Sequence, residues 1–98
     1  MAKQLIWTSK ARAELREILE YWAARNKSKT FSRRLYGLIN EQLALLCEFP
    51  HLGRATDIPG VYIKVVHKYL VYYEIKKQNL YVLTIRHGSR DSETPDIE

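Results

Sequence analysis

The sequence contains little cysteine, proline or glycine. Its 98 residues include one cysteine, three prolines and four glycines. A single cysteine cannot form an internal disulfide, and Cys47 lies within an apolar helical run, so we interpret it as a small buried hydrophobic residue. The composition therefore excludes the disulfide-rich scaffolds of small secreted proteins.

Long hydrophobic runs and ligand motifs are also missing. No apolar run is long enough to cross a membrane, and the start of the chain, Met1–Gln4, does not resemble a signal peptide. We therefore expect a cytoplasmic protein without membrane contact. No Cys/His/Asp cluster has metal-ligand spacing and no glycine-rich loop marks a nucleotide site, so we expect neither a metal nor another cofactor.

What the sequence does contain is an ordinary globular composition with a basic charge balance. Hydrophobic residues make up 46% and charged residues 28%, and 16 Lys and Arg against 11 Asp and Glu give a formal charge of +5. The length suits one domain with a single core. The positive charge favours an acidic partner, which is either nucleic acid or protein.

The segment from Val61 to Asp91 carries most of the β-forming residues. Three runs of β-branched and aromatic residues predict strands: Val61–Val66, Tyr69–Ile75 and Leu80–Ile85. The breaks between the runs are short enough for hairpin connections, so the three strands should form an antiparallel meander. The tyrosines in these runs are interpreted as cross-strand packing in preference to an RNA-stacking platform.

Two amphipathic helices are predicted before these strands. Lys3–Trp7 reads as a first strand, with Thr8 or Ser9 as the helix N-cap. The first helix, Lys10–Asn26, has one apolar stripe and a charged face that we assign to solvent, including Arg12, Glu14 and Arg16. The apolar stripe consists of Ala11, Leu15, Ile18, Leu19 and Trp22.

The second helix is predicted over Thr30–Glu48, where Gln42 interrupts the stripe and Pro50 stops the helix. Its expected apolar set is Phe31, Leu35, Leu38, Ile39, Leu45, Leu46 and Phe49. Since the link between the helices is short, they should form an antiparallel hairpin. The segment His51–Gly60 reads as a loop returning the chain to the sheet.

The element order βααβββ predicts a two-layer α+β domain. The helical hairpin should pack on one face of a small antiparallel sheet, with the first strand at an edge or between later strands. We expect residues 1–91 to form this domain. Ser92–Glu98 is predicted to be an acidic tail with the composition of a disordered end.

Four segments resemble the RelE/ParE superfamily of bacterial toxins. They are WTSKARAELREILEYW, FPHLGR, GVYIKVVHKYLVYYEI and LYVLTIRHGSRD, and the likeness extends from about Leu5 to Asp91. These toxins belong to type II toxin–antitoxin systems and are also called plasmid stabilisation proteins. The resemblance implies the same βααβββ fold.

The ending Arg86-His87-Gly88-Ser89-Arg90-Asp91 is more similar to the ParE-like branch, which inhibits DNA gyrase by binding. On this reading the protein is a growth-inhibiting toxin and not an enzyme. The resemblance makes Arg54, Lys64, Arg86 and Arg90 candidates for contact with the target or the antitoxin. One departure is Val61-Tyr62, where relatives often carry an arginine.

The RelE-like branch, which cuts mRNA on the ribosome, is the alternative. Lys64 and Arg90 match basic positions of that branch, and His87 beside Arg86 offers a proton-transfer group next to a cation. The catalytic set of such a ribonuclease would be Lys64, Arg86, His87 and Arg90. Other matches fail, because Tyr62 and Leu70 replace basic residues and no tyrosine follows Tyr81.

The resemblance also implies a cognate antitoxin as partner. We expect an extended or helical segment of the antitoxin in a groove of the toxin, with its acidic residues at the Lys/Arg face and its apolar anchors between the helices and the sheet. A homodimer or a toxin–antitoxin heterotetramer is common among relatives. A third alternative is a relative that has lost toxicity and only binds the antitoxin.

Overall fold

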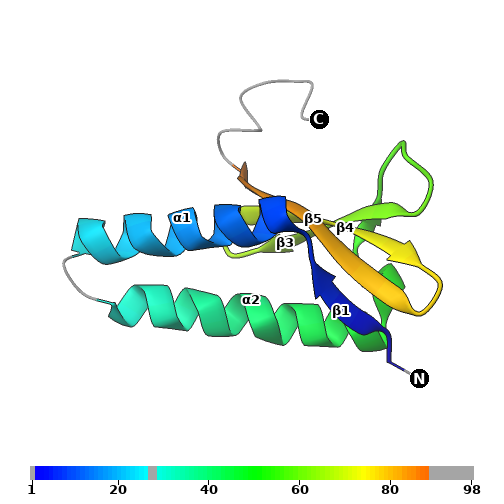
Figure 1. Ribbon diagram of the computed structural model, residues 1–98, viewed down its shortest axis with the longest axis horizontal. Coiled ribbons are helices and arrows are strands. Elements are labelled where there is room, and N and C mark those ends of the chain that lie inside the picture. Colours follow the sequence, from blue (N-terminus) through cyan, green and yellow to red (C-terminus); the bar gives the residue numbers. More distant parts are fainter. Residues whose placement is uncertain (1, 27–28, 89–98) are drawn as a thin grey trace.

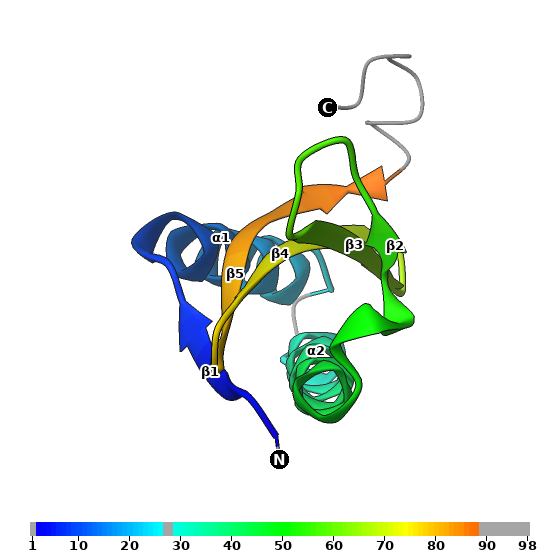
Figure 2. The same cartoon turned by 90° about the vertical axis from the view of Figure 1, so that its right-hand side faces the viewer.

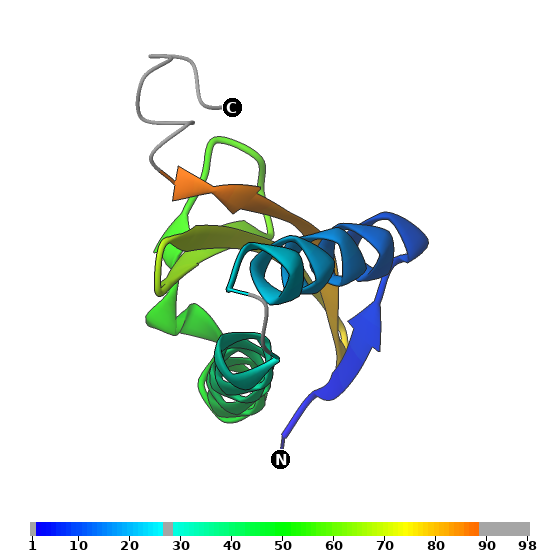
Figure 3. The same cartoon turned by 90° about the vertical axis from the view of Figure 1, so that its left-hand side faces the viewer.

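The computed structural model describes residues 2–26 and 29–88 of the chain. In chain order the elements are β1 (Gln4–Trp7), α1 (Ser9–Asn26), α2 (Thr30–Glu48), the 3-10 helix η1 (Pro50–Leu52), β2 (Arg54–Ala55), β3 (Val61–Val66), β4 (Tyr69–Lys76) and β5 (Asn79–His87). The helices α1 and α2 run antiparallel to each other (Figure 1). Both lie on one side of a twisted sheet (Figures 2 and 3), which confirms the predicted two-layer α+β fold.

The five strands are ordered β1-β5-β4-β3-β2 across the sheet. The strands β3, β4 and β5 form the predicted antiparallel meander. The sheet as a whole is mixed, however, because β1 lies at one edge and pairs with β5 in parallel, Gln4 opposite Asn79. A parallel neighbour needs a long crossover, which the helices and strands between β1 and β5 provide.

The segment predicted as a plain loop contains η1 and the short strand β2. The hydroxyl of Tyr73 donates a hydrogen bond to the Pro50 carbonyl (2.7 Å) and accepts one from the Gly53 N–H (3.1 Å). A side chain at Gly53 would collide with this hydroxyl and with the Ile63 carbonyl. Gly53 therefore lets the backbone pass close to Tyr73, and Arg54 then pairs with Ile63 at the sheet edge.

Each hairpin of the meander has a two-residue connection. Val66 pairs with Tyr69 and Lys76 pairs with Asn79. The first connecting residues, His67 and Lys77, have φ angles of 58° and 56°. This left-handed region costs an ordinary L-residue about 1–2 kcal/mol, so the surrounding pairing must hold both turns in place.

The core lies between the helices and the sheet. Its fully buried side chains include Leu35, Ile39, Leu43, Leu46, Val71, Tyr73, Leu80 and Val82. Cys47 is buried, as predicted. The predicted stripe of α2 was partly wrong, because Leu43 is in the core while Leu45 and Phe49 are 40% and 58% exposed. Leu35, Ile39, Leu43 and Leu46 recur at helical spacing, and this places them on one side of α2.

The start of α1 is fixed to β5. Thr8 is the N-cap, since its Oγ1 accepts a hydrogen bond from the Ala11 N–H (3.2 Å), and the same hydroxyl donates to the Val82 carbonyl (2.7 Å). Glu14, predicted to face solvent, instead accepts hydrogen bonds from the Thr84 hydroxyl (2.6 Å) and the Ile85 N–H (3.1 Å). Side chains of α1 thus cover the part of the β5 edge that extends beyond β1.

Neither α1 nor α2 is long and apolar enough to cross a membrane, and this holds for every helix among the described residues.

Candidate functional site

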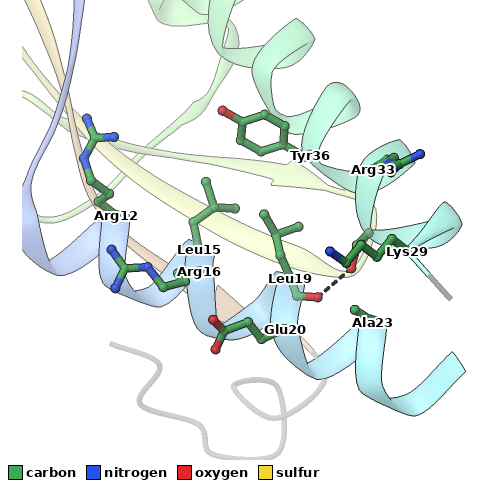
Figure 4. A pocket seen from close by; sticks show the side chains of 10 residues that line it. Arg12, Leu15, Arg16, Leu19, Glu20, Ala23, Lys29, Arg33 and Tyr36 are labelled. Atoms are coloured by element: carbon green, nitrogen blue, oxygen red, sulfur yellow. Dashed lines mark hydrogen bonds between the residues drawn. The ribbon is translucent and has the colours of Figure 1, made fainter. Parts of the chain in front are cut away.

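A groove with a volume of about 450 Å³ runs between α1 and α2. Its lining consists of Arg12, Leu15, Arg16, Leu19, Glu20 and Ala23 from α1, of Ser32, Arg33 and Tyr36 from α2, and of Lys29, which directly precedes α2. Leu15 and Leu19 point from α1 toward α2, and the ring of Tyr36 reaches across from α2 (Figure 4). Tyr36 is 47% exposed, so an apolar and aromatic surface is open to a partner.

The helical period explains why these side chains meet in the groove. Leu15 and Leu19 are four residues apart on α1, and so are Ser32 and Tyr36 on α2, which places each pair on one helix face. The buried Ser32 hydroxyl donates a hydrogen bond to the Leu19 carbonyl (2.5 Å), so the small side chain ties the two helices together. This contact fixes the width of the groove at that position.

The rim of the groove is basic. Arg12, Arg16, Lys29 and Arg33 are all exposed, and Glu20 is the one carboxylate that lines the groove. Four positive charges around an apolar floor are complementary to an acidic amphipathic segment. This surface can therefore bind a helix that carries apolar residues on one side and carboxylates beside them.

The second candidate surface is the face of the sheet opposite the helices, which we call the open face. Arg54, Ile63 and Tyr72 lie opposite one another on β2, β3 and β4. Directly opposed residues of paired strands point to the same face. The neighbouring residues Tyr62, Val71 and Tyr73 belong to the helix-facing core, so Arg54, Ile63 and Tyr72 point away from it.

Arg86 belongs to the same open face. It pairs with Leu70 and follows the core residue Ile85, and its guanidinium carbon lies 5.7 Å from the centre of the Tyr72 ring. Val65, opposite Leu70, is 58% exposed. The open face therefore has an apolar centre with Arg54 and Arg86 at its sides, and arginine and tyrosine are enriched where proteins bind one another.

The predicted ribonuclease residues are not brought together. Lys64 pairs with the buried Val71 and points to the helix side of the sheet, whereas Arg86 points to the open face. His87 contacts the Tyr69 ring (centroids 5.3 Å apart), also on the helix side, and β4 separates it from Lys64. Two side chains on opposite faces of a sheet cannot flank one phosphate. Arg90 lies outside the described residues, as does the tail Ser92–Glu98.

The groups with altered acidity are structural. Burial raises the pKa of the Tyr73 hydroxyl, and the hydrogen bond from Gly53 partly offsets this rise. Burial also raises the pKa of the Cys47 thiol, and Glu48 adds to the effect. Among residues 2–26 and 29–88, no group of three or more His, Cys, Asp or Glu side chains is placed to hold a metal ion. The described residues thus present two candidate binding surfaces and no assembled metal site.

The sequence analysis expected a groove for the antitoxin but did not place it between α1 and α2. Arg12 and Arg16 were read as ordinary surface charge, although their spacing of four residues beside Leu15 and Leu19 is the pattern of a basic rim next to an apolar strip. Recognising it requires knowing that α2 leaves this side of α1 uncovered. For the open face, in contrast, Arg54 and Arg86 were both predicted as contact residues.

Comparisons with known proteins agree with this architecture. The family model described as the ParE toxin of the type II toxin–antitoxin system parDE matches residues 5–92. The chromosomal ParDE toxin–antitoxin system from P. aeruginosa contains a chain of similar fold, with a TM-score of 0.74 and 22% sequence identity, over 88% of this chain and 96% of that chain.

A second solved structure, the toxin–antitoxin complex RelBE2 from Mycobacterium tuberculosis, has a TM-score of 0.65 and 16% identity over 89% of this chain and 99% of the similar chain. A comparison with curated protein sequences finds no match. The family model covers nearly the whole chain, including both helices and all five strands. The chain therefore belongs to the ParE toxin family of type II toxin–antitoxin systems.

Proposed function

We propose that this ParE-family toxin inhibits DNA gyrase by binding it and that a cognate antitoxin neutralises the toxin. The observation that carries the proposal is the presence of two surfaces, the groove and the open face, that each combine apolar side chains with arginines. The family match supports a toxin, and the structural neighbours are toxin–antitoxin systems. The separation of Lys64 from Arg86 gives no support to the alternative, a ribonuclease.

In this proposal the antitoxin binds the groove between α1 and α2. The groove extends from Arg12 to Ala23 along α1, which at 1.5 Å per residue is about 16 Å, or three helical turns. An acidic amphipathic helix of about 11 residues matches this length. Its apolar side chains would contact Leu15, Leu19 and Tyr36, and its carboxylates would approach the basic rim.

The groove is tested with charge-matched variants. Replacing Arg16 and Arg33 by Gln removes two rim charges, while replacing Lys10 and Arg34 by Gln removes the same charge from the same helices outside the groove. We expect the first pair to weaken antitoxin binding by about fivefold in calorimetry, because an exposed ion pair contributes about 0.5 kcal/mol. The second pair should change it less than twofold. Equal effects of both pairs would reject the groove.

The open face is the proposed contact for gyrase. Arginine is enriched among the few interface residues whose loss costs about 2 kcal/mol or more. Replacing Arg86 by Ala removes the cation above Tyr72 and, if Arg86 is one of them, lowers inhibition of DNA supercoiling by at least tenfold. Arg34→Gln, on the exposed side of α2, is the matched control and should inhibit as the wild type does. Ribosome-dependent cleavage of mRNA with unimpaired gyrase would overturn the proposal.

A further inference from the structure

The groove and the open face lie on opposite sides of the molecule. The described residues that line the groove belong to α1 and α2, apart from Lys29, which directly precedes α2. Arg54, Val65 and Arg86 project from the other side of the sheet. A helix with its side chains is about 10 Å across, so at least this thickness separates an occupant of the groove from the open face.

The groove is also short. A segment of about three turns fills it, and such a segment ends near Ala23 or Arg12 without touching the sheet. Figures 2 and 3 show the helices on one side of the sheet, and neither helix extends over the open face. An occupant of the groove therefore does not cover the outer side of the sheet, which carries Arg54 and Arg86.

The groove and the open face have a similar composition. Each has an apolar centre with arginines beside it: Leu15, Leu19 and Tyr36 in the groove, and Val65 and Leu70 on the open face. Among the described strand residues, the open face carries one carboxylate, that of Glu74. Glu74 pairs with Val61, and this pair lies beside the row formed by Arg54, Ile63 and Tyr72. An acidic chain with apolar side chains can thus bind both surfaces in succession.

From this geometry we infer that anchoring and neutralisation are separate events. A short acidic helix binds the groove and leaves the open face available to the target, so that a ternary complex forms. Neutralisation requires a second acidic segment that continues from the helix around the sheet edge onto Arg54 and Arg86. This inference rests on the proposed function, because it takes the open face as the target contact.

Joining the two segments also has a predictable effect on affinity. Once the helix is anchored, the second segment binds as an intramolecular reaction at an effective concentration in the millimolar range. A two-segment binder should therefore exceed the groove helix in affinity by about 10²–10⁴-fold. Replacing Arg54 and Arg86 by Gln should remove most of that gain and leave the affinity of the groove helix unchanged.

The test uses a synthetic acidic peptide of about 11 residues, with leucines four apart and glutamates beside them, added to the full-length toxin. We expect saturating peptide to shift the backbone amide resonances of Ala23 and Ser32 and to leave those of Leu70 and Tyr72 in place. In a supercoiling assay, inhibition should persist within twofold at saturation. Loss of inhibition or shifts on both surfaces would overturn the inference.

The remaining outcomes are also decisive. A peptide that fails to bind at millimolar concentration would overturn both the groove assignment and this inference. A toxin that does not inhibit gyrase, but whose peptide footprint remains confined to the groove, would overturn only the proposed target. The separation of the two surfaces would then stand on the resonance data alone.

Discussion

At the scale of single residues, Tyr73 and Gly53 explain the turn between α2 and the sheet. Tyr73 is fully buried, and its hydroxyl holds both the Pro50 carbonyl and the Gly53 N–H. The motif Phe49-Pro50-His51-Leu52-Gly53-Arg54 is therefore a structural unit that positions Arg54 on the open face. This role depends on a tyrosine located twenty residues further along the chain.

Replacing Tyr73 by Phe should destabilise the fold by about 1–3 kcal/mol, because the buried Pro50 and Gly53 groups would lose their partner. The free energy of unfolding in urea measures this loss. Tyr36→Phe removes a hydroxyl from a half-exposed ring and is the matched control. A loss as small as that of the control would show that the Tyr73 hydroxyl does not hold the turn.

The buried Cys47 thiol should make the stability of the fold depend on pH in the alkaline range. Burial raises its pKa above the ordinary 9.0, so the folded thiol keeps its proton when the unfolded thiol has lost it. The resulting stability is fully present below pH 9 and is lost as the pH rises through the folded value. Tyr73, with a pKa raised above 10.0, acts in the same direction at higher pH.

We therefore expect the melting temperature to fall as the pH rises above 9.0, and to fall less steeply in Cys47→Ala. Each protein is compared with itself across pH, which cancels the cost of the cavity that alanine leaves. Parallel curves for the two proteins would show that the thiol does not contribute.

At the scale of elements, the junction between α1 and β5 depends on one carboxylate. β1 pairs with β5 only as far as Val82, and beyond this residue Glu14 binds Thr84 and Ile85. An unpaired strand edge invites association with another strand. Glu14 therefore protects the edge next to Arg86 and fixes α1 against it.

Glu14→Ala should cost about 2 kcal/mol, because a buried N–H and a hydroxyl lose a charged acceptor. Amide exchange at Ile85 should become at least tenfold faster. Glu17→Ala, at an exposed site of the same helix, is the control. Unchanged exchange at Ile85 would mean that water replaces the carboxylate without loss.

At the scale of the whole molecule, the positive charge should govern how fast partners bind. The formal charge is +5, and four cations surround the groove. Association of an acidic peptide with the groove should slow by about tenfold or more between low and high salt, while dissociation changes little. Stopped-flow fluorescence measures both rates, and a salt-independent association rate would argue against steering by the basic rim.

Local patterns predicted the elements well, since their signals are local. Pro50 and the apolar spacing located α2 over Thr30–Glu48, and two short breaks located the hairpins. The parallel pairing of β1 with β5 was not predictable, because the sequence of a strand does not specify which other strand it pairs with. Glu14 was misassigned for a related reason: its partners Thr84 and Ile85 are about seventy residues away.

For the candidate sites, too, the residues were predictable from local sequence, whereas their arrangement in space was not. Arg54 and Arg86 were identified by resemblance, but that they share a face depends on the strand register. Lys64 and Arg86 looked like neighbours in one catalytic set until the alternation of the sheet placed them on opposite faces. The groove depends on the distance between α1 and α2, and this distance cannot be predicted from the sequence of either helix alone.

The parallel pairing of β1 with β5 also determines the order of folding. Gln4–Trp7 is made first, yet its partner Asn79–Val82 is among the last described residues to be synthesised. Contacts so distant in sequence form slowly, because a long loop must close before they add stability. During synthesis on the ribosome, β1 stays unpaired until β5 emerges, so the growing chain cannot complete its sheet or its Arg86-bearing surface before that point.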